Sequence, residues 1–305
     1  MSDNTASLRR KIAGAGDLQS VVRTMKAVAA ASIGQYENSV HALADYYSTI
    51  ELGLSACFRK GALVADASEE PRPQVVGGRG AIVFGSDQGL VGQFNDLVAE
   101  YAVKSLAALP GPVHVWAVGE RVQARLVDAS LKPAGLFAVP TSVKAVTPLV
   151  GQILVECETL HGRGQVTEFH LFYNRPTFGA IYTPVHQKLF PLDAEWQRKL
   201  SERPWPTRSL PQIMETGTTT LRSLIREYLF VSLFRACAES LASENASRLA
   251  AMERADKNID ELLDELNGTF HRLRQGGIDE ELFDVISGFE ALTVSGDQKQ
   301  GATNS

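Results

Sequence analysis

The chain has 305 residues and a formal net charge of −5, and 21% of its residues are charged. This length allows one or two domains, and the lack of a basic half or a Lys/Arg-rich run argues against nucleic-acid binding. The three cysteines are far apart and have no CxxC spacing, so we expect neither disulfides nor structural zinc. No apolar run reaches about eighteen residues and no targeting pattern opens the sequence, so we predict a soluble protein that is not exported.

The first part of the chain, residues 1–60, is predicted to form one long helix. Small or apolar residues recur along it in steps of three and four: Val22, Met25, Ala29, Ser32, Tyr36, Val40, Leu43, Tyr47, Ile50 and Leu54. A repeat of about 3.5 residues kept up over this length requires a partner helix. We therefore predict a coiled-coil helix over 1–60, followed by a connector over 61–80 that is rich in Pro and Gly.

The middle of the chain, residues 81–192, alternates short apolar runs with amphipathic stretches. Strands are predicted over 81–84, 113–118, 166–173 and 180–189, and helices over 95–109, 120–131 and 147–160. This alternation indicates a small, Rossmann-like α/β domain with a largely parallel sheet. Residues 193–209 lose this periodicity, and we predict a connecting loop there.

The C-terminal part, residues 210–292, again has helical periodicity. Its apolar positions are Leu221, Ile225, Tyr228, Val231, Ile259, Leu262, Leu266, Phe270 and Leu273. Alanines between the two apolar runs would let another helix approach closely. We expect this coiled-coil helix and the N-terminal one to wind around each other as a rod, and we predict a disordered tail over 293–305.

A Gly-rich loop follows the first predicted strand, at residues 85–95. Gly85, Gly89 and Gly92 do not give GxGxxG spacing, and no GK[ST] follows as in a phosphate-binding loop. The histidines of the middle domain lack catalytic or metal-ligand partners at a recognisable spacing, and the acidic residues of 253–265 fit the solvated face of a helix. The residues indicate no active site, so we expect no catalytic residue, cofactor or metal.

Three segments together point to a known family. They are VRTMKAVAAA at 22–31, GSDQGLVG at 85–92 and SENASRLAAM at 243–252. Arg274, Gln275 and the ISGFEAL run at 286–292 also match the family's ending in type and order. With these motifs the chain resembles the γ subunit of F-type ATP synthases over nearly its whole length.

The resemblance implies a fold and a role. The long terminal helices form an antiparallel coiled coil that enters a ring of three α and three β subunits, and the α/β domain lies beside the ε subunit and the membrane c-ring. The nucleotide sites are on β, and the γ subunit rotates to couple ion flow to ATP synthesis or hydrolysis there. We therefore expect a non-catalytic subunit held at the cytoplasmic face of a bacterial inner membrane through the complex alone.

The resemblance also implies functions for particular residues. Met25 falls on a methionine involved in coupling, and Arg248, Arg274 and Gln275 fall on positions of coupling or contact with the β subunit. Ser86, Asp87, Gly89 and Gly92 belong to the family loop near the foot of the stalk. Without the resemblance, Met25 is equally a packing residue of the coiled coil, and Arg248 is equally a solvated helix charge.

Several positions depart from the family pattern. Gln88 replaces a basic residue, Val91 a cysteine and Ser32 a lysine, which indicates a divergent branch. Gly276 and Gly277 would weaken the C-terminal helix and predict a bend there. We expect a bacterial alternative-type ATPase, for which H⁺ and Na⁺ are both candidate coupling ions. A coiled-coil scaffold without a rotary role and a Rossmann-like nucleotide-binding enzyme are the competing hypotheses.

Overall fold

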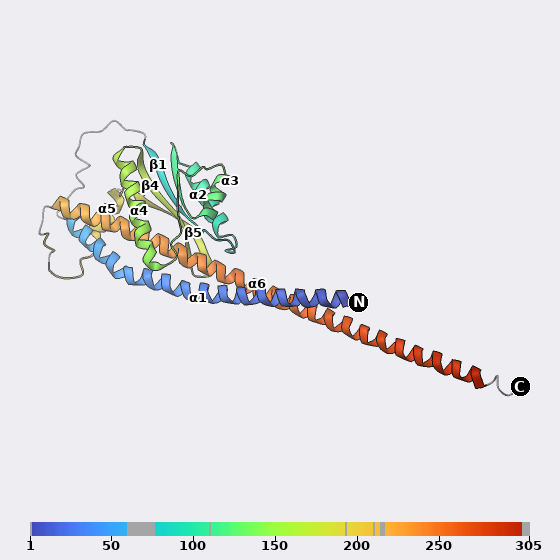
Figure 1. The fold of residues 1–305 in the computed structure, drawn as a ribbon. Helices are drawn as coiled ribbons and strands as arrows, with labels where there is room; N and C mark the ends of the chain where they lie inside the picture. The colour runs from blue at the N-terminus through green and yellow to red at the C-terminus, as the bar shows by residue number, and fades with distance from the viewer. Residues whose placement is uncertain are drawn as a thin grey trace. The chain divides into compact units, whose positions relative to one another are not determined.

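The computed structural model describes residues 2–59, 77–109, 111–192, 194–209, 211–213 and 217–300. The chain divides into two compact units, Met1–Lys26 with Met252–Ser305, and Ala27–Ala251. Helix α1 (Ser2–Arg59) and helix α6 (Gly217–Gln300) each contribute to both units (Figure 1). Most of the predicted connector 61–80 lies outside the described residues.

The larger unit contains a five-stranded sheet in the order β3-β2-β1-β4-β5. Its strands are β1 (Gly78–Phe84), β2 (Val113–Val118), β3 (Gly135–Phe137), β4 (Val166–Thr177) and β5 (Ala180–Phe190). The pairs β3–β2, β2–β1 and β1–β4 are parallel, whereas β5 pairs with β4 in the antiparallel direction. The central strand β1 is buried along most of its length, as expected of a parallel strand covered on both faces. The predicted Rossmann-like domain with a largely parallel sheet is confirmed.

Helices cover both faces of this sheet (Figure 1). On one face, α2 (Phe94–Ala107) and α3 (Glu120–Asp128) pack Val98 and Leu126 against Val83 of β1. On the other face, α4 (Val143–Gly162) and α6 pack Ile153 and Leu233 against the sheet. The alanines of α6 at 236, 238 and 242 are buried in this second core, so the small side chains bring α6 close to the domain.

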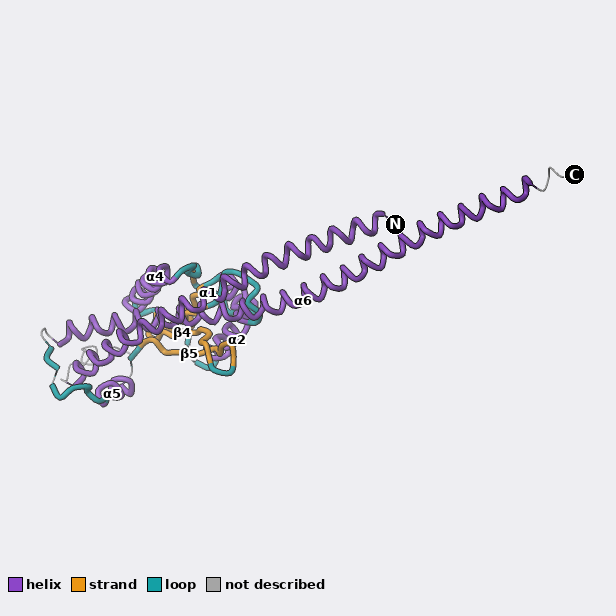
Figure 2. Tube along the Cα trace, turned by 90° about the horizontal axis from the view of Figure 1, so that it is seen from below, coloured by secondary structure: helices purple, strands orange, loops and turns teal. Residues whose placement is uncertain are grey.

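Helices α1 and α6 are paired and antiparallel in the larger unit. The Tyr46 hydroxyl donates a hydrogen bond to Glu227 at 2.8 Å, and Leu54 of α1 shares a buried cluster with Leu221 of α6. A further helix, α5 (Ala194–Glu202), lies beside these ends of the two helices (Figure 2). Leu200 of α5 is buried in the same cluster, so the predicted loop over 193–209 is wrong in this part. A nine-residue helix with few buried side chains gives too little periodicity to be recognised.

Other boundaries also differ from the sequence prediction. Strand β1 begins at Gly78, within the predicted connector, and the three-residue strand β3 was not predicted because it is too short to show a pattern. Helix α6 runs to Gln300, so residues 293–300 are helical rather than part of a disordered tail. No proline occurs there to end the helix. The remaining tail residues, 301–305, lie outside the described part. Among the described residues, no helix is long and apolar enough to span a membrane.

Candidate functional site

In the smaller unit, α1 and α6 are joined by ion pairs. The Arg23 guanidinium lies 3.1 Å from Asp256 and 3.6 Å from Asp260, and the Lys26 ammonium lies 3.8 Å from Asp256. Arg23 contacts Asp256 and Asp260, whereas Lys26, three residues later on α1, contacts the earlier Asp256. The two helix segments therefore run antiparallel. The sequence predicts both aspartates on a solvated helix face. Asp260 is exposed as predicted, whereas Asp256 is largely covered by its contacts with cations of the partner helix. Met25 lies beside these cations on α1 and is half-buried.

The next part of α6 in this unit has a different environment. The Arg9 guanidinium lies 5.3 Å from the centre of the Phe270 ring, close to the N-terminal end of α1. Beyond Phe270, Arg274 and Gln275 are both exposed. Five large apolar side chains that follow are also exposed: Ile278, Leu282, Phe283, Val285 and Ile286. Phe283 is 70% exposed. Such a concentration of exposed apolar groups on one helix marks a surface that binds another protein.

In the larger unit, residues 243–251 of the SENASRLAAM motif join α6 to the α/β domain. The Ser243 hydroxyl donates a hydrogen bond to the Asn174 carbonyl at 3.0 Å, and the Ser247 hydroxyl donates one to the Val91 carbonyl at 2.5 Å. Both serines are buried. These bonds add buried donors to two carbonyl groups of the domain, one of which, Val91, also accepts from the Phe94 amide at 3.3 Å. Two of the motifs that carried the family resemblance therefore meet at one polar junction.

The Gly-rich loop is held by its own hydrogen bonds. The Ser86 amide donates to Asn95 Oδ1 at 2.9 Å, and Asn95 Nδ2 donates to the Ser86 hydroxyl at 2.8 Å. A side chain on Gly85 would come within 2.3 Å of Val122, and Gly92 has a φ of 56°. Gly89 is half-buried. The glycines thus permit close packing and a left-handed turn.

Asp87 of this loop ties two other segments together. One carboxylate oxygen accepts a hydrogen bond from the Glu120 amide at 3.0 Å, and the other accepts one from the Val139 amide at 2.9 Å. The first contact places a negative charge at the N-terminus of α3, where it is stabilised by the helix dipole. Because this carboxylate is fixed in the loop and the Ser86 amide is already bonded, the arrangement disfavours a phosphate ligand.

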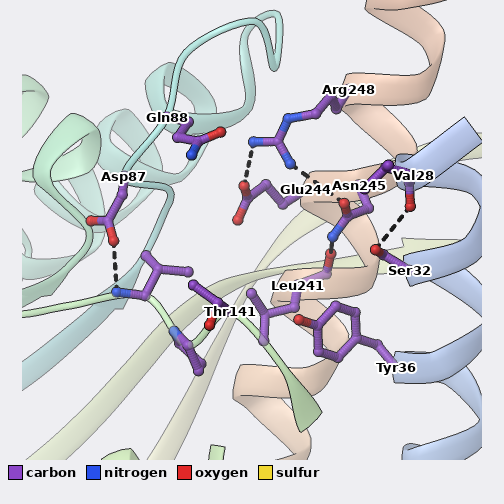
Figure 3. A pocket seen from close by; sticks show the side chains of 12 residues that line it. Val28, Ser32, Tyr36, Asp87, Gln88, Thr141, Leu241, Glu244, Asn245 and Arg248 are labelled. Carbon is purple, nitrogen blue, oxygen red and sulfur yellow. Dashed lines mark hydrogen bonds and ion pairs between the residues drawn. The ribbon is translucent and has the colours of Figure 1, made fainter. Parts of the chain in front are cut away.

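Arg248 is turned toward its own helix. Its Nη2 atom donates to Glu244 Oε1 at 2.6 Å, and its Nη1 atom lies 3.4 Å from Asn245 Oδ1 (Figure 3). The Arg248 side chain is 12% exposed. Burial raises the pKa of Glu244 and nearby Asp87 raises it further, while Arg248 acts in the opposite direction. The structure therefore places Arg248 at the domain junction, and contact with a β subunit stays a prediction.

Two histidines whose contact the sequence does not predict lie on neighbouring strands. His170 Nδ1 is 2.8 Å from His186 Nε2, and the His186 ring is stacked on Phe172. Burial lowers the pKa of both histidines, so the pair is held neutral. Strand pairing creates this contact between residues far apart in sequence. Among the described residues, no group of three or more His, Cys, Asp or Glu could hold a metal ion.

The fold and these contacts define a class of protein in which an α/β domain is inserted between two long helices that pair in antiparallel fashion. The family model described as ATP synthase matches residues 4–292. The chain belongs to this ATP synthase family.

Curated relatives agree with this assignment. The chain is 26% identical over 293 residues to the ATP synthase gamma chain of Moorella thermoacetica, with 93% of this chain and 98% of that one covered. It is 28% identical over 313 residues to the ATP synthase gamma chain of Salinibacter ruber, with coverages of 96% and 99%. The predicted resemblance to the γ subunit is confirmed.

Solved structures share the fold. The rotor of the Euglena gracilis mitochondrial ATP synthase matches with a TM-score of 0.63 at 15% identity, covering 91% of this chain and 100% of that chain. The central stalk and c-ring structure from Tetrahymena thermophila matches with a TM-score of 0.53 at 20% identity, covering 77% and 99%.

Proposed function

We propose that this chain is the central-stalk rotor, or γ subunit, of an F-type ATP synthase. It couples ion flow through the membrane sector to ATP synthesis or hydrolysis at sites on the β subunits, and it is itself non-catalytic. Family membership over residues 4–292 supports this role. The observation that carries it is the exposed apolar surface of α6 at 278–286, which requires a protein partner of its own.

The partners follow from the same role. The exposed end of α6 fits the interior of the ring of α and β subunits, and the α/β domain fits the ε subunit and the membrane c-ring. The complex is peripheral, and we place it at the cytoplasmic face of a bacterial inner membrane, in keeping with the bacterial sources of the curated relatives. Identities below 30% to those relatives support a divergent, alternative-type ATPase.

Assembly tests this function. The full chain is mixed with α and β subunits of the same source, and the complex is isolated and assayed for ATP hydrolysis. We expect one copy of the chain per three αβ pairs and hydrolysis that depends on its presence. A scaffold without a rotary role would leave hydrolysis unchanged, and a chain that α and β do not bind would contradict the proposal.

The proposed contact residues have a separate test in the assembled complex. Arg274→Ala combined with Gln275→Ala removes two exposed polar groups without opening a core, so the chain should still assemble. We expect ATP-driven ion pumping to fall more than ATP hydrolysis, and we expect the same for Met25→Lys. Arg272→Ala is the control, because this exposed side chain bonds to Thr269 of its own helix. Equal pumping by all variants would contradict the roles proposed for Met25, Arg274 and Gln275.

A further inference from the structure

A pocket of about 280 Å³ opens at the domain junction within the larger unit. It is bounded by α1, α6, the Gly-rich loop and the segment that follows β3. Figure 3 shows Gln88, Glu244 and Arg248 pointing toward the same space from two sides. The roles of the loop and of α6 in joining the domain do not account for this space.

Two buried atoms at the pocket have no hydrogen-bond partner among the described residues. One is Glu244 Oε2, and the other is Arg248 Nε. The Glu244 side chain is only 7% exposed, and the Glu244–Arg248 ion pair uses one carboxylate oxygen and leaves the other free. A buried carboxylate oxygen without a donor is costly, because it has lost its hydration without gaining a hydrogen bond. An occupant that donates a hydrogen bond to Glu244 would remove this cost.

The charge of the lining specifies the kind of donor. Asp87 and Glu244 contribute two carboxylates, and Arg248 contributes one cation, so the ionised pocket has an excess negative charge. The interaction between the two carboxylates disfavours ionisation of Glu244, and a further cation beside Glu244 would favour its ionised form. A cationic donor therefore fits better than a neutral one.

The apolar part of the lining specifies what carries the cation. Val139, Pro140 and Leu241 form apolar walls beside the carboxylates, and Val28 lies at the pocket on α1. Long cationic side chains pack their methylene groups along apolar surfaces while the charged head binds elsewhere. The combination of apolar walls with a buried carboxylate suits such an amphipathic group, and the volume is sufficient for one short chain with its head.

We propose that this pocket binds an ammonium or guanidinium group carried on a short apolar stem. The head donates to Glu244 Oε2, and the stem lies against Pro140 and Leu241. The group belongs either to a free amine or to a Lys or Arg side chain of a partner subunit. Arg248 is then a positioning residue that holds the Glu244 carboxylate through its Nη2 atom.

Binding is measured on the full chain by calorimetry and ligand-observed NMR with butylammonium and butylguanidinium. Butyramide and butyrate are the matched neutral and anionic probes. We expect saturable binding of both cations and at least tenfold weaker binding of the other two, about 1.4 kcal/mol. Equal binding of butyramide, or no saturable binding of either cation, would overturn the proposal, as would a crystal structure soaked in butylammonium that shows an ordered water only.

Variants locate the binding. Glu244→Gln keeps the size of the side chain and removes its charge, and it should weaken cation binding at least tenfold. Glu158→Gln is the control, because this half-exposed glutamate of α4 pairs with Arg226 away from the pocket lining. Gln88→Lys is a second variant, and it leaves Glu244 in place. Its new ammonium group should occupy the pocket and so weaken binding of the cationic probes. Unchanged affinity in folded Glu244→Gln and Gln88→Lys proteins would contradict the assignment.

The assembled complex distinguishes the two sources of the cation. If a partner side chain fills the pocket, butylammonium should no longer bind once the α, β and ε subunits and the c-ring are all present. If the natural ligand is a free amine, binding should persist with similar affinity in the complex. Either outcome supports a cation pocket, whereas persistent binding that no longer depends on Glu244 would contradict it.

Discussion

At the scale of single residues, His170 and His186 show how strand pairing creates an environment that the sequence does not predict. Neither histidine has a catalytic or metal-ligand partner at a recognisable spacing in its own segment, so the sequence does not indicate that the two meet. Antiparallel pairing of β4 with β5 brings their ring nitrogens to 2.8 Å. The carboxylate of Glu168 lies 3.4 Å from the other side of His170, and the Lys188 ammonium lies 3.6 Å from that glutamate.

This histidine pair makes stability depend on pH. Burial lowers the folded-state pKa of both residues below the unfolded value of about 6.5. The unfolded chain therefore binds more protons as the pH falls, and the free energy of unfolding should decrease from about pH 6.5 through the folded pKa values. Urea denaturation at several pH values measures this decrease.

The loss below about pH 6.5 should be smaller in the double variant His170→Gln with His186→Gln. His41→Gln is the control, because it replaces an exposed histidine of α1 that lies outside the pair. An identical pH dependence in the double variant and the wild type would show that the pair does not cause it.

Ser247 provides a second prediction at this scale. Ser247→Ala leaves the Val91 carbonyl without the buried donor that now lies at 2.5 Å. Because the Phe94 amide still donates to this carbonyl at 3.3 Å, the free energy of unfolding of the larger unit should fall by about 0.5–1.5 kcal/mol. Ser20→Ala is the matched control, since this exposed hydroxyl bonds only to the Gly16 carbonyl one turn earlier on α1. If the two variants had the same midpoint of urea unfolding, the Ser247 hydrogen bond would not stabilise the larger unit.

At the scale of elements, both long helices tolerate glycine, including the pair in α6 for which the sequence predicts a bend. Helix α6 continues through Gly276 and Gly277, and α1 continues through Gly14 and Gly16. A side chain added at Gly276 would meet nothing within 4 Å. The backbone there remains helical, and the cost of glycine lies in the greater freedom of the unfolded chain.

Gly276→Ala should therefore stabilise its part of α6 by up to about 1 kcal/mol. Hydrogen exchange of the amides in 270–287 measures the change, and slower exchange is expected. Gly119→Ala is the opposite case, because Gly119 has a φ of 115° and an added side chain would lie 2.7 Å from the Ser86 carbonyl oxygen. It should destabilise the larger unit. Faster exchange around Gly276→Ala would contradict an open helical position.

The elements also show which features a sequence can predict. Long periodic helices and apolar strands were predicted well, because each carries its pattern in consecutive residues. The short elements α5 and β3 were missed, because their stability depends on neighbours such as the cluster around Leu200. The polar junction was also missed, since Ser247 and Val91 are brought together only by the fold. The motifs identified the family without revealing that two of them contact each other.

At the scale of the whole molecule, the proposed function requires this chain to rotate within a ring of α and β subunits. The chain offers a selective labelling position for a direct measurement. Cys57 and Cys237 are buried, and burial raises the pKa of Cys157 to about 12, so all three thiols should react slowly. Phe178 is fully exposed at the turn between β4 and β5, and Phe178→Cys would provide a reactive thiol.

The most direct test is single-molecule observation of this labelled chain in an immobilised complex with α and β subunits. A particle attached through Phe178→Cys should turn continuously in one direction when ATP is added, with one pause for each β subunit in every turn, and it should stop without ATP. A complex that hydrolyses ATP while the labelled chain stays fixed would contradict the rotor function.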